Sequence, residues 1–192
     1  MDRTPRWCLL LLAACSLAAA PAPSPDADAT SAAQAAIQKW PKACKVTAAA
    51  MIEEYGQPDQ FDRHALAWFN KGTWRRTVVS RKPRDGKSCL EQTIAYLVPK
   101  ERVAKLKRFS PRLTVNPTAG ELSFASASEA TNHLALNLAD EIVVGKRTVP
   151  EAREFFARTK RLGQSGKSSP YLDQLRFDVD NDRYMTPTGA DR

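Results

Sequence analysis

The sequence is poor in residues that perform catalysis or bind metals. Among 192 residues there are two histidines, His64 and His133, and four cysteines. The chain contains no Gly-x-Ser-x-Gly motif and no His-Glu-x-x-His motif, the patterns of many serine hydrolases and of zinc peptidases. These absences argue against both enzyme classes, and we expect no cofactor and no metal.

Long hydrophobic runs are also missing. The longest apolar stretch, residues 7–20, has fourteen residues and is interrupted by Ser16, whereas a permanent membrane span needs about 20. Two arginines and one aspartate precede it in residues 1–6. A charged start followed by a short apolar run is typical of a secretory signal. We therefore predict a signal peptide over residues 1–14 and an exported protein.

The end of this apolar run resembles a bacterial lipobox. The residues are Leu12-Ala13-Ala14-Cys15, and the resemblance implies lipidation of Cys15 and cleavage just before it. Ser16 is similar to the residue that sends lipoproteins to the outer membrane by default. Residues 15–31, rich in proline, alanine and serine, would then be a lipid-anchored tether. The alternative is ordinary cleavage after Ala29, which gives a soluble periplasmic or secreted protein.

The remaining cysteines are a candidate disulfide. Cys8 lies in the signal and Cys15 in the lipobox, which leaves Cys44 and Cys89. In an oxidising compartment such a pair forms a bridge, and closing a loop of about 45 residues stabilises by about 4 kcal/mol. The alternative is two buried thiols. Cys89 has the opposite parity to the apolar face of the strand that follows it, which weakens the case for a bridge if the helix and the apolar face meet on the same side, but parity is a soft rule at the end of a strand.

The formal net charge of +8 at pH 7 suggests an anionic partner. An exported basic protein meets anionic lipid, lipopolysaccharide and envelope proteins, so we expect these or the membrane as partners and no nucleic acid. Basic residues gather in residues 71–87 and 100–112. If the two segments lie side by side, they form a basic surface that contains Arg75, Arg76, Arg81, Lys105 and Arg108. The alternative is two solvated faces balanced by glutamates elsewhere.

Hydrophobic periodicity predicts a single α+β domain over residues 32–178, followed by a disordered tail over residues 179–192. The domain has N-terminal helices, a small antiparallel sheet of about five strands and a C-terminal antiparallel helix pair. Capping boxes at Ser126 and Thr148 begin the two closing helices. The expected elements are a helix over 32–55 interrupted at Pro41, a hairpin over 66–81, a strand over 90–98, a helix over 99–109 and a hairpin over 113–125.

A catalytic alternative rests on one polar stripe. His133, Asp140 and Glu141 lie on one side of the first closing helix, together with Asn137. Imidazole and carboxylate can act as metal ligands or as an acid and base. A periplasmic enzyme that uses these residues is therefore the alternative to a non-enzymatic protein, although any half-buried helix shows such a stripe.

Two resemblances to known families accompany these patterns. The segments KWPKACKVTAAAMIEEYGQPDQ, LAWFNKGTWRRTVV and LALNLADEIVVGKRTVPEAREFF resemble a family of uncharacterised exported bacterial proteins, which implies no activity. The helix that ends at Gly56, followed by Pro58 and a strand with Trp68, is similar to the small outer-membrane lipoproteins of the β-barrel assembly machinery (SmpA/BamE type). This second resemblance implies a shared local architecture and no activity. From the export signal, the lipobox and the basic charge, we expect an envelope lipoprotein on the periplasmic face of the outer membrane, acting as a non-enzymatic binding or assembly component.

Overall fold

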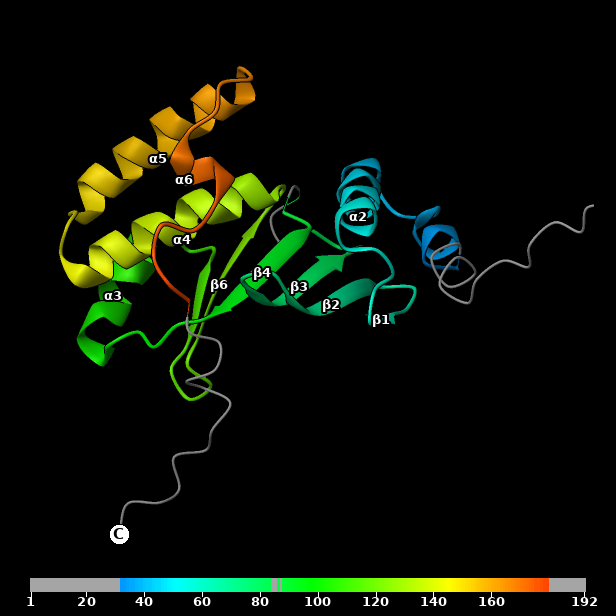
Figure 1. Cartoon of the computed structure of the whole chain (residues 1–192), viewed down its shortest axis with the longest axis horizontal. Coiled ribbons are helices and arrows are strands. Elements are labelled where there is room, and N and C mark those ends of the chain that lie inside the picture. Colours follow the sequence, from blue (N-terminus) through cyan, green and yellow to red (C-terminus); the bar gives the residue numbers. More distant parts are fainter. Residues whose placement is uncertain (1–31, 84–85, 87, 180–192) are drawn as a thin grey trace, which may run out of the picture.

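The computed structural model describes residues 32–83, 86 and 88–179 of the chain (Figure 1). The predicted signal peptide (1–14), the lipidation site Cys15 and the predicted tether (15–31) lie outside the described residues, as does the predicted tail beyond residue 179. The described part is an α+β structure, as the sequence predicts. One antiparallel sheet of six strands carries all of the packed helices on one face.

The sheet has the strand order β1-β2-β3-β4-β6-β5, with every neighbouring pair antiparallel. The two predicted hairpins are present, as β2 with β3 and as β5 with β6. The prediction missed β1, because a strand of two residues is too short to show an alternating pattern. The strands are β1 (Gln60–Phe61), β2 (Ala65–Lys71), β3 (Trp74–Ser80), β4 (Leu90–Ala95), β5 (Leu113–Asn116) and β6 (Glu121–Ser126).

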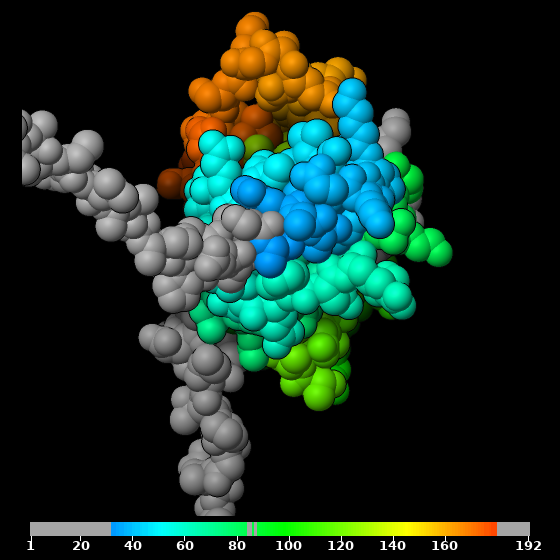
Figure 2. All heavy atoms as spheres, turned by 90° about the vertical axis from the view of Figure 1, so that its right-hand side faces the viewer, coloured from blue at the N-terminus to red at the C-terminus, as the bar shows by residue number. Residues whose placement is uncertain are grey.

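The helices pack in two groups (Figure 1). Residues 32–37 are helical and lead into α2 (Lys42–Tyr55), which lies over β2 and β3. Along the sheet, α4 (Glu129–Val144) lies over β4 and β6, and α3 (Lys100–Phe109) and α5 (Val149–Gln164) pack beside it. A short helix, α6 (Pro170–Asp173), rests on α4. Figure 2 shows the end of the molecule that residues 32–55 cover, with α5 above them.

Each group of helices encloses its own hydrophobic core. Under α2, Trp68 and Leu66 are fully buried together with the disulfide. Under α4, Phe124 and Leu122 of β6 and the helices beside it form the larger core. The two cores lie on the same face of the sheet. From β2 to β6, the buried residues of each strand are paired with buried residues of the next strand, so their side chains project to the same side.

The two closing helices begin differently from each other. Thr148 and Glu151 form the predicted capping box of α5. At α4 the prediction is wrong by two residues, since Ser128 is the N-cap and accepts a hydrogen bond from Thr131 N. Ser126 instead accepts from Ser128 N at 3.2 Å and donates to Ser128 O at 2.8 Å. The Glu129 carboxylate is therefore not used in a cap.

Cys44 and Cys89 form the predicted disulfide, with an S–S distance of 2.09 Å and a Cα–Cα distance of 5.3 Å. Cys89 lies one residue before β4 begins, and parity constrains only residues paired within a strand, so its position does not oppose the bridge. The structure rules out the alternative of two buried thiols. Such a bond persists in oxidising compartments, which is consistent with export. Among the described helices, none has both the length and the apolar character to cross a bilayer.

Candidate functional site

The predicted basic residues lie in three separate places. Arg75 and Arg76 of β3 both reach Glu121, at 3.4 Å and 4.0 Å, so a carboxylate partly neutralises them. Arg81 follows β3 and lines a hollow near His64. Lys105 and Arg108 are on α3, which packs beside β5, α4 and α5. Because β4 and β6 separate β3 from β5, the expected single surface does not form.

Lys105 and Arg108 line a cleft of about 620 Å³, here called the α3 cleft. It lies between α3 and the turn that joins α4 to α5. Its cationic side chains are Arg102, Lys105, Arg108, Arg147 and Arg153, over an apolar floor that contains Ile142 and Val149. No described aspartate or glutamate lines it.

Most of the charge in the α3 cleft is not neutralised. Arg147 Nε bonds Glu141 at 2.6 Å. Arg153 donates to two main-chain carbonyls at the end of α3, including Phe109 O at 3.3 Å, which leaves its net charge in place. Arg102, Lys105 and Arg108 form no ion pair within the described ranges. Their spacing of three residues places them on one side of α3, while Leu106 and Phe109 face the core.

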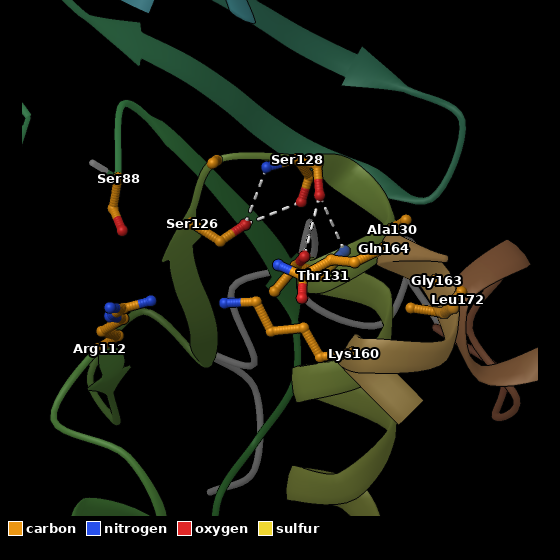
Figure 3. Close-up of a pocket in the computed structure, with 11 residues that line it drawn as sticks. Ser88, Arg112, Ser126, Ser128, Ala130, Thr131, Lys160, Gly163, Gln164 and Leu172 are labelled. Carbon is orange, nitrogen blue, oxygen red and sulfur yellow. Dashed lines mark hydrogen bonds between the residues drawn. The ribbon is translucent and has the colours of Figure 1, made fainter. Parts of the chain in front are cut away.

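A second hollow, the hydroxyl pocket, lies at the start of α4 and has a volume of about 440 Å³ (Figure 3). Lys160 of α5 reaches across it toward Arg112, beneath Ser126. The hydroxyl groups that line it are those of Ser88, Ser126, Ser128 and Thr131. Again no described carboxylate is among the lining residues, so the pocket offers cations and hydrogen-bonding hydroxyl groups.

A third hollow, the phenylalanine hollow, lies between the first two and measures about 250 Å³. Phe109, Phe124 and Phe156 line it, and the centroid of the Phe156 ring lies 6.1 Å from that of Phe109 and 6.2 Å from that of Phe124. Arg112, Arg153 and Lys160 line it as well, so the aromatic rings lie among cationic side chains.

Shared residues join the three hollows into one feature, which we call the α5 groove. Arg112 and Lys160 line both the hydroxyl pocket and the phenylalanine hollow, and Arg153 lines both that hollow and the α3 cleft. Arg153, Phe156 and Lys160 are spaced so that they share one side of α5. The groove therefore has cationic side chains along its whole length and three phenylalanine rings at its middle, with no acidic lining residue in the described part of the chain.

Sequence reasoning missed a polar network centred on Glu129. Its Oε1 accepts from Trp74 Nε1 at 2.9 Å, and its Oε2 accepts from Gln92 Nε2 at 3.1 Å and from the Tyr55 hydroxyl. Asn132 Nδ2 donates to Gln92 Oε1 at 2.8 Å. Burial, followed by the hydrogen bond to Glu129, raises the pKa of Tyr55. Gln92, the one polar residue on an apolar strand face, is the signal in the sequence that points to this network.

The residues of the catalytic alternative have separate partners. His133 stacks on Trp74 with ring centroids 4.9 Å apart. Asp140 accepts from the Tyr96 hydroxyl at 2.8 Å, and Glu141 is held in the ion pair with an arginine described above. In the part of the chain that the structure describes, no three histidine, cysteine or acidic side chains could together hold a metal ion.

Comparison with known proteins gives no relative: no protein-family model, curated protein or solved structure matches the chain. The two family resemblances stay predictions.

Proposed function

We propose that the protein is an exported envelope lipoprotein on the periplasmic face of the outer membrane, and that it is a non-enzymatic component that binds anionic groups of the envelope. The observation that carries this proposal is the α5 groove, which is cationic at both ends and has no described acidic lining residue. The disulfide supports export. The lipid anchor rests on the lipobox around Cys15.

The α3 cleft supplies most of the expected affinity. A lysine or arginine close to an anionic membrane contributes about 1 kcal/mol. Arg102, Lys105 and Arg108, which form no ion pair in the described part of the chain, then contribute about 3 kcal/mol together, roughly a hundredfold in the binding constant. A guanidinium group also binds a phosphate through two parallel hydrogen bonds, which favours phosphate over a general negative surface.

Vesicle binding tests the cleft directly. The double variant Lys105→Glu/Arg108→Glu is compared with Lys107→Glu, which changes an exposed lysine of the same helix outside the cleft. We expect wild type to bind vesicles that contain phosphatidylglycerol, and the double variant to bind them at least about tenfold more weakly. Equal binding by the double variant and the control at low salt would contradict the proposal.

The lipid anchor needs its own measurement. The protein is expressed with its native signal in a Gram-negative host, beside Cys15→Ser, and its intact mass and membrane fractionation are recorded. A mature mass that begins at residue 15 and carries acyl chains, lost in the variant, supports the anchor. A soluble product that begins after Ala29 removes the anchor and leaves a soluble exported binding protein.

A further inference from the structure

We propose that the phenylalanine hollow binds the C-terminal residue of a partner protein. The apolar side chain of that residue lies against the rings, and its free carboxylate lies among the cations. This inference goes beyond the proposed function, which requires anionic groups and no apolar contact. The residues that precede the C-terminus run along the α5 groove, which continues from the hollow in both directions through shared lining residues. The ligand is therefore a polypeptide whose chain ends in an accessible large apolar residue.

The hollow offers an apolar surface of the size of one side chain. Phe109 of α3 and Phe124 of β6 line it and are 6% and 1% exposed. Phe156 of α5 is only half-buried, so its ring adds apolar surface that a ligand can cover. The volume of about 250 Å³ is below the roughly 300–1,000 Å³ of pockets that enclose whole small molecules. One side chain at the end of a longer ligand therefore matches the hollow better than a complete small molecule does.

Donors for an anion surround the same rings. Arg153 and Lys160 lie three residues before and four residues after Phe156, so all three share one side of α5. Lys160 has no acidic partner within the described residues and extends toward Arg112 (Figure 3). The Ser110 hydroxyl accepts from Arg112 N at 3.2 Å, and its own proton has no acceptor among the described residues. An ammonium, a guanidinium and a hydroxyl group can therefore donate to a carboxylate.

A chain end is the part of a protein that brings an apolar side chain and a carboxylate to the same place. At the last residue one Cα atom carries both, so both fit into one small hollow. Within an extended chain, neighbouring side chains point to opposite faces, and the next one on the same face is about 7 Å away. An internal acidic residue therefore directs its carboxylate away from the hollow that its apolar neighbour fills. An anionic lipid matches less well, because its acyl chains are longer than a hollow of about 250 Å³ accommodates.

Binding of short labelled peptides to the full-length protein tests the inference. Three peptides share one uncharged sequence and carry a fluorescent label at the N-terminus. The first ends in leucine with a free carboxylate, the second in leucine amide, and the third in alanine with a free carboxylate. We expect the first to bind at least about tenfold more tightly than either of the others, measured by fluorescence anisotropy. The amide loses hydrogen bonds to a charged group, and alanine loses the burial of a large apolar side chain.

Variants of the donors test the placement of the carboxylate. Lys160→Gln is compared with Arg161→Gln, which changes the next residue, an exposed site outside the hollow. We expect Lys160→Gln to lose most of the preference for the carboxylate over the amide, and Arg161→Gln to keep it. Ser110→Ala should reduce the same preference by a smaller factor, about threefold. Unchanged thermal unfolding of the variants shows that a loss of binding is not a loss of folding.

A fourth peptide carries aspartate before leucine and an amidated end, so its charge and its apolar side chain equal those of the first. If it binds as tightly as the free C-terminus, if amide and carboxylate bind equally, or if no peptide binds, the C-terminal ligand is wrong. If decanoate binds more tightly than the first peptide, the occupant is a fatty acid and the inference is likewise wrong. These results leave the proposed function untouched, because Lys105 and Arg108, which the vesicle experiment tests, do not line the phenylalanine hollow.

Discussion

The Glu129 network should contribute a large part of the stability of this fold. The side chain connects α4, which covers the larger core, to Tyr55 of α2, which covers the smaller one, and to Trp74 of β3 and Gln92 of β4 in the sheet beneath them. Trp74 is 2% exposed and Gln92 is fully buried, so these two donors depend on the Glu129 carboxylate, whose own side chain is 25% exposed. Glu129→Ala therefore leaves buried donors without an acceptor.

The magnitude follows from the hydrogen bonds that are lost. A hydrogen bond to a charged group contributes about 1.5–3 kcal/mol net, and a buried donor left without an acceptor costs about 1–3 kcal/mol. In the variant the Gln92 amide still donates to Thr77 Oγ1, which lies 3.4 Å away. The largest loss is therefore at Trp74 and Tyr55. We expect Glu129→Ala to lower the free energy of unfolding by about 3 kcal/mol, and Glu129→Gln, which retains one acceptor, by about half of that.

Urea unfolding followed by tryptophan fluorescence measures this loss. Glu53→Ala is the matched control, because Glu53 is an exposed glutamate of α2 that makes no hydrogen bond or ion pair within the described chain. Exposed sites of this kind usually change stability by less than about 0.5 kcal/mol. If Glu129→Ala costs no more than Glu53→Ala, the network does not hold the two cores together and the reasoning is wrong.

Three further predictions concern stability. Replacing Cys44 and Cys89 by alanine should lower the free energy of unfolding by about 4 kcal/mol, because the bond closes a loop with a sequence separation of 45; urea unfolding with and without reductant should show the same loss in wild type and none in the variant. Burial lowers the pKa of His133 in the folded protein, so as the pH falls the unfolded chain takes up a proton on this residue before the folded protein does. Stability should therefore fall as pH drops below about 6.5. Thermal unfolding across pH measures this slope, which should be absent in His133→Gln. Asn137 donates to two carbonyls and accepts one amide proton from the chain at and after α6, so Asn137→Leu should speed proteolytic cleavage within residues 165–179 while the rest of the domain stays intact; an unchanged digest would contradict this role.

Local patterns predicted the secondary structure well. The break at Pro41, the glycine after α2, the two hairpins and the Thr148 capping box are each set by residues within a few positions of one another. The cap of α4 was misplaced because Ser126 and Ser128 both fit the position. The structure uses Ser128 and directs Ser126 to the adjacent main chain. This choice depends on the residue at which β6 leaves the sheet, which the local sequence does not determine.

The candidate site was predicted only in part for a similar reason. Lys105 and Arg108 were identified from a basic cluster on one short helix, and the structure places them in the α3 cleft. Lys160 and Phe156 were missed, since nothing in the local pattern of α5 distinguishes a residue that faces a groove from one that faces solvent. Arg75 and Arg76 were grouped with α3 because the strand order was unknown.

The sequence by itself determined the surplus of positive charge and the pair of cysteines available for a disulfide. It also predicted the export signal and the order of helices and strands. These depend on composition and on periodicity over a few residues. Only the tertiary structure decided that β6 inserts between β4 and β5, that Glu129 connects two cores, and that α5 aligns cationic and aromatic side chains along one groove. These contacts join residues far apart in the chain, and which of them form depends on how all of the apolar faces are buried together.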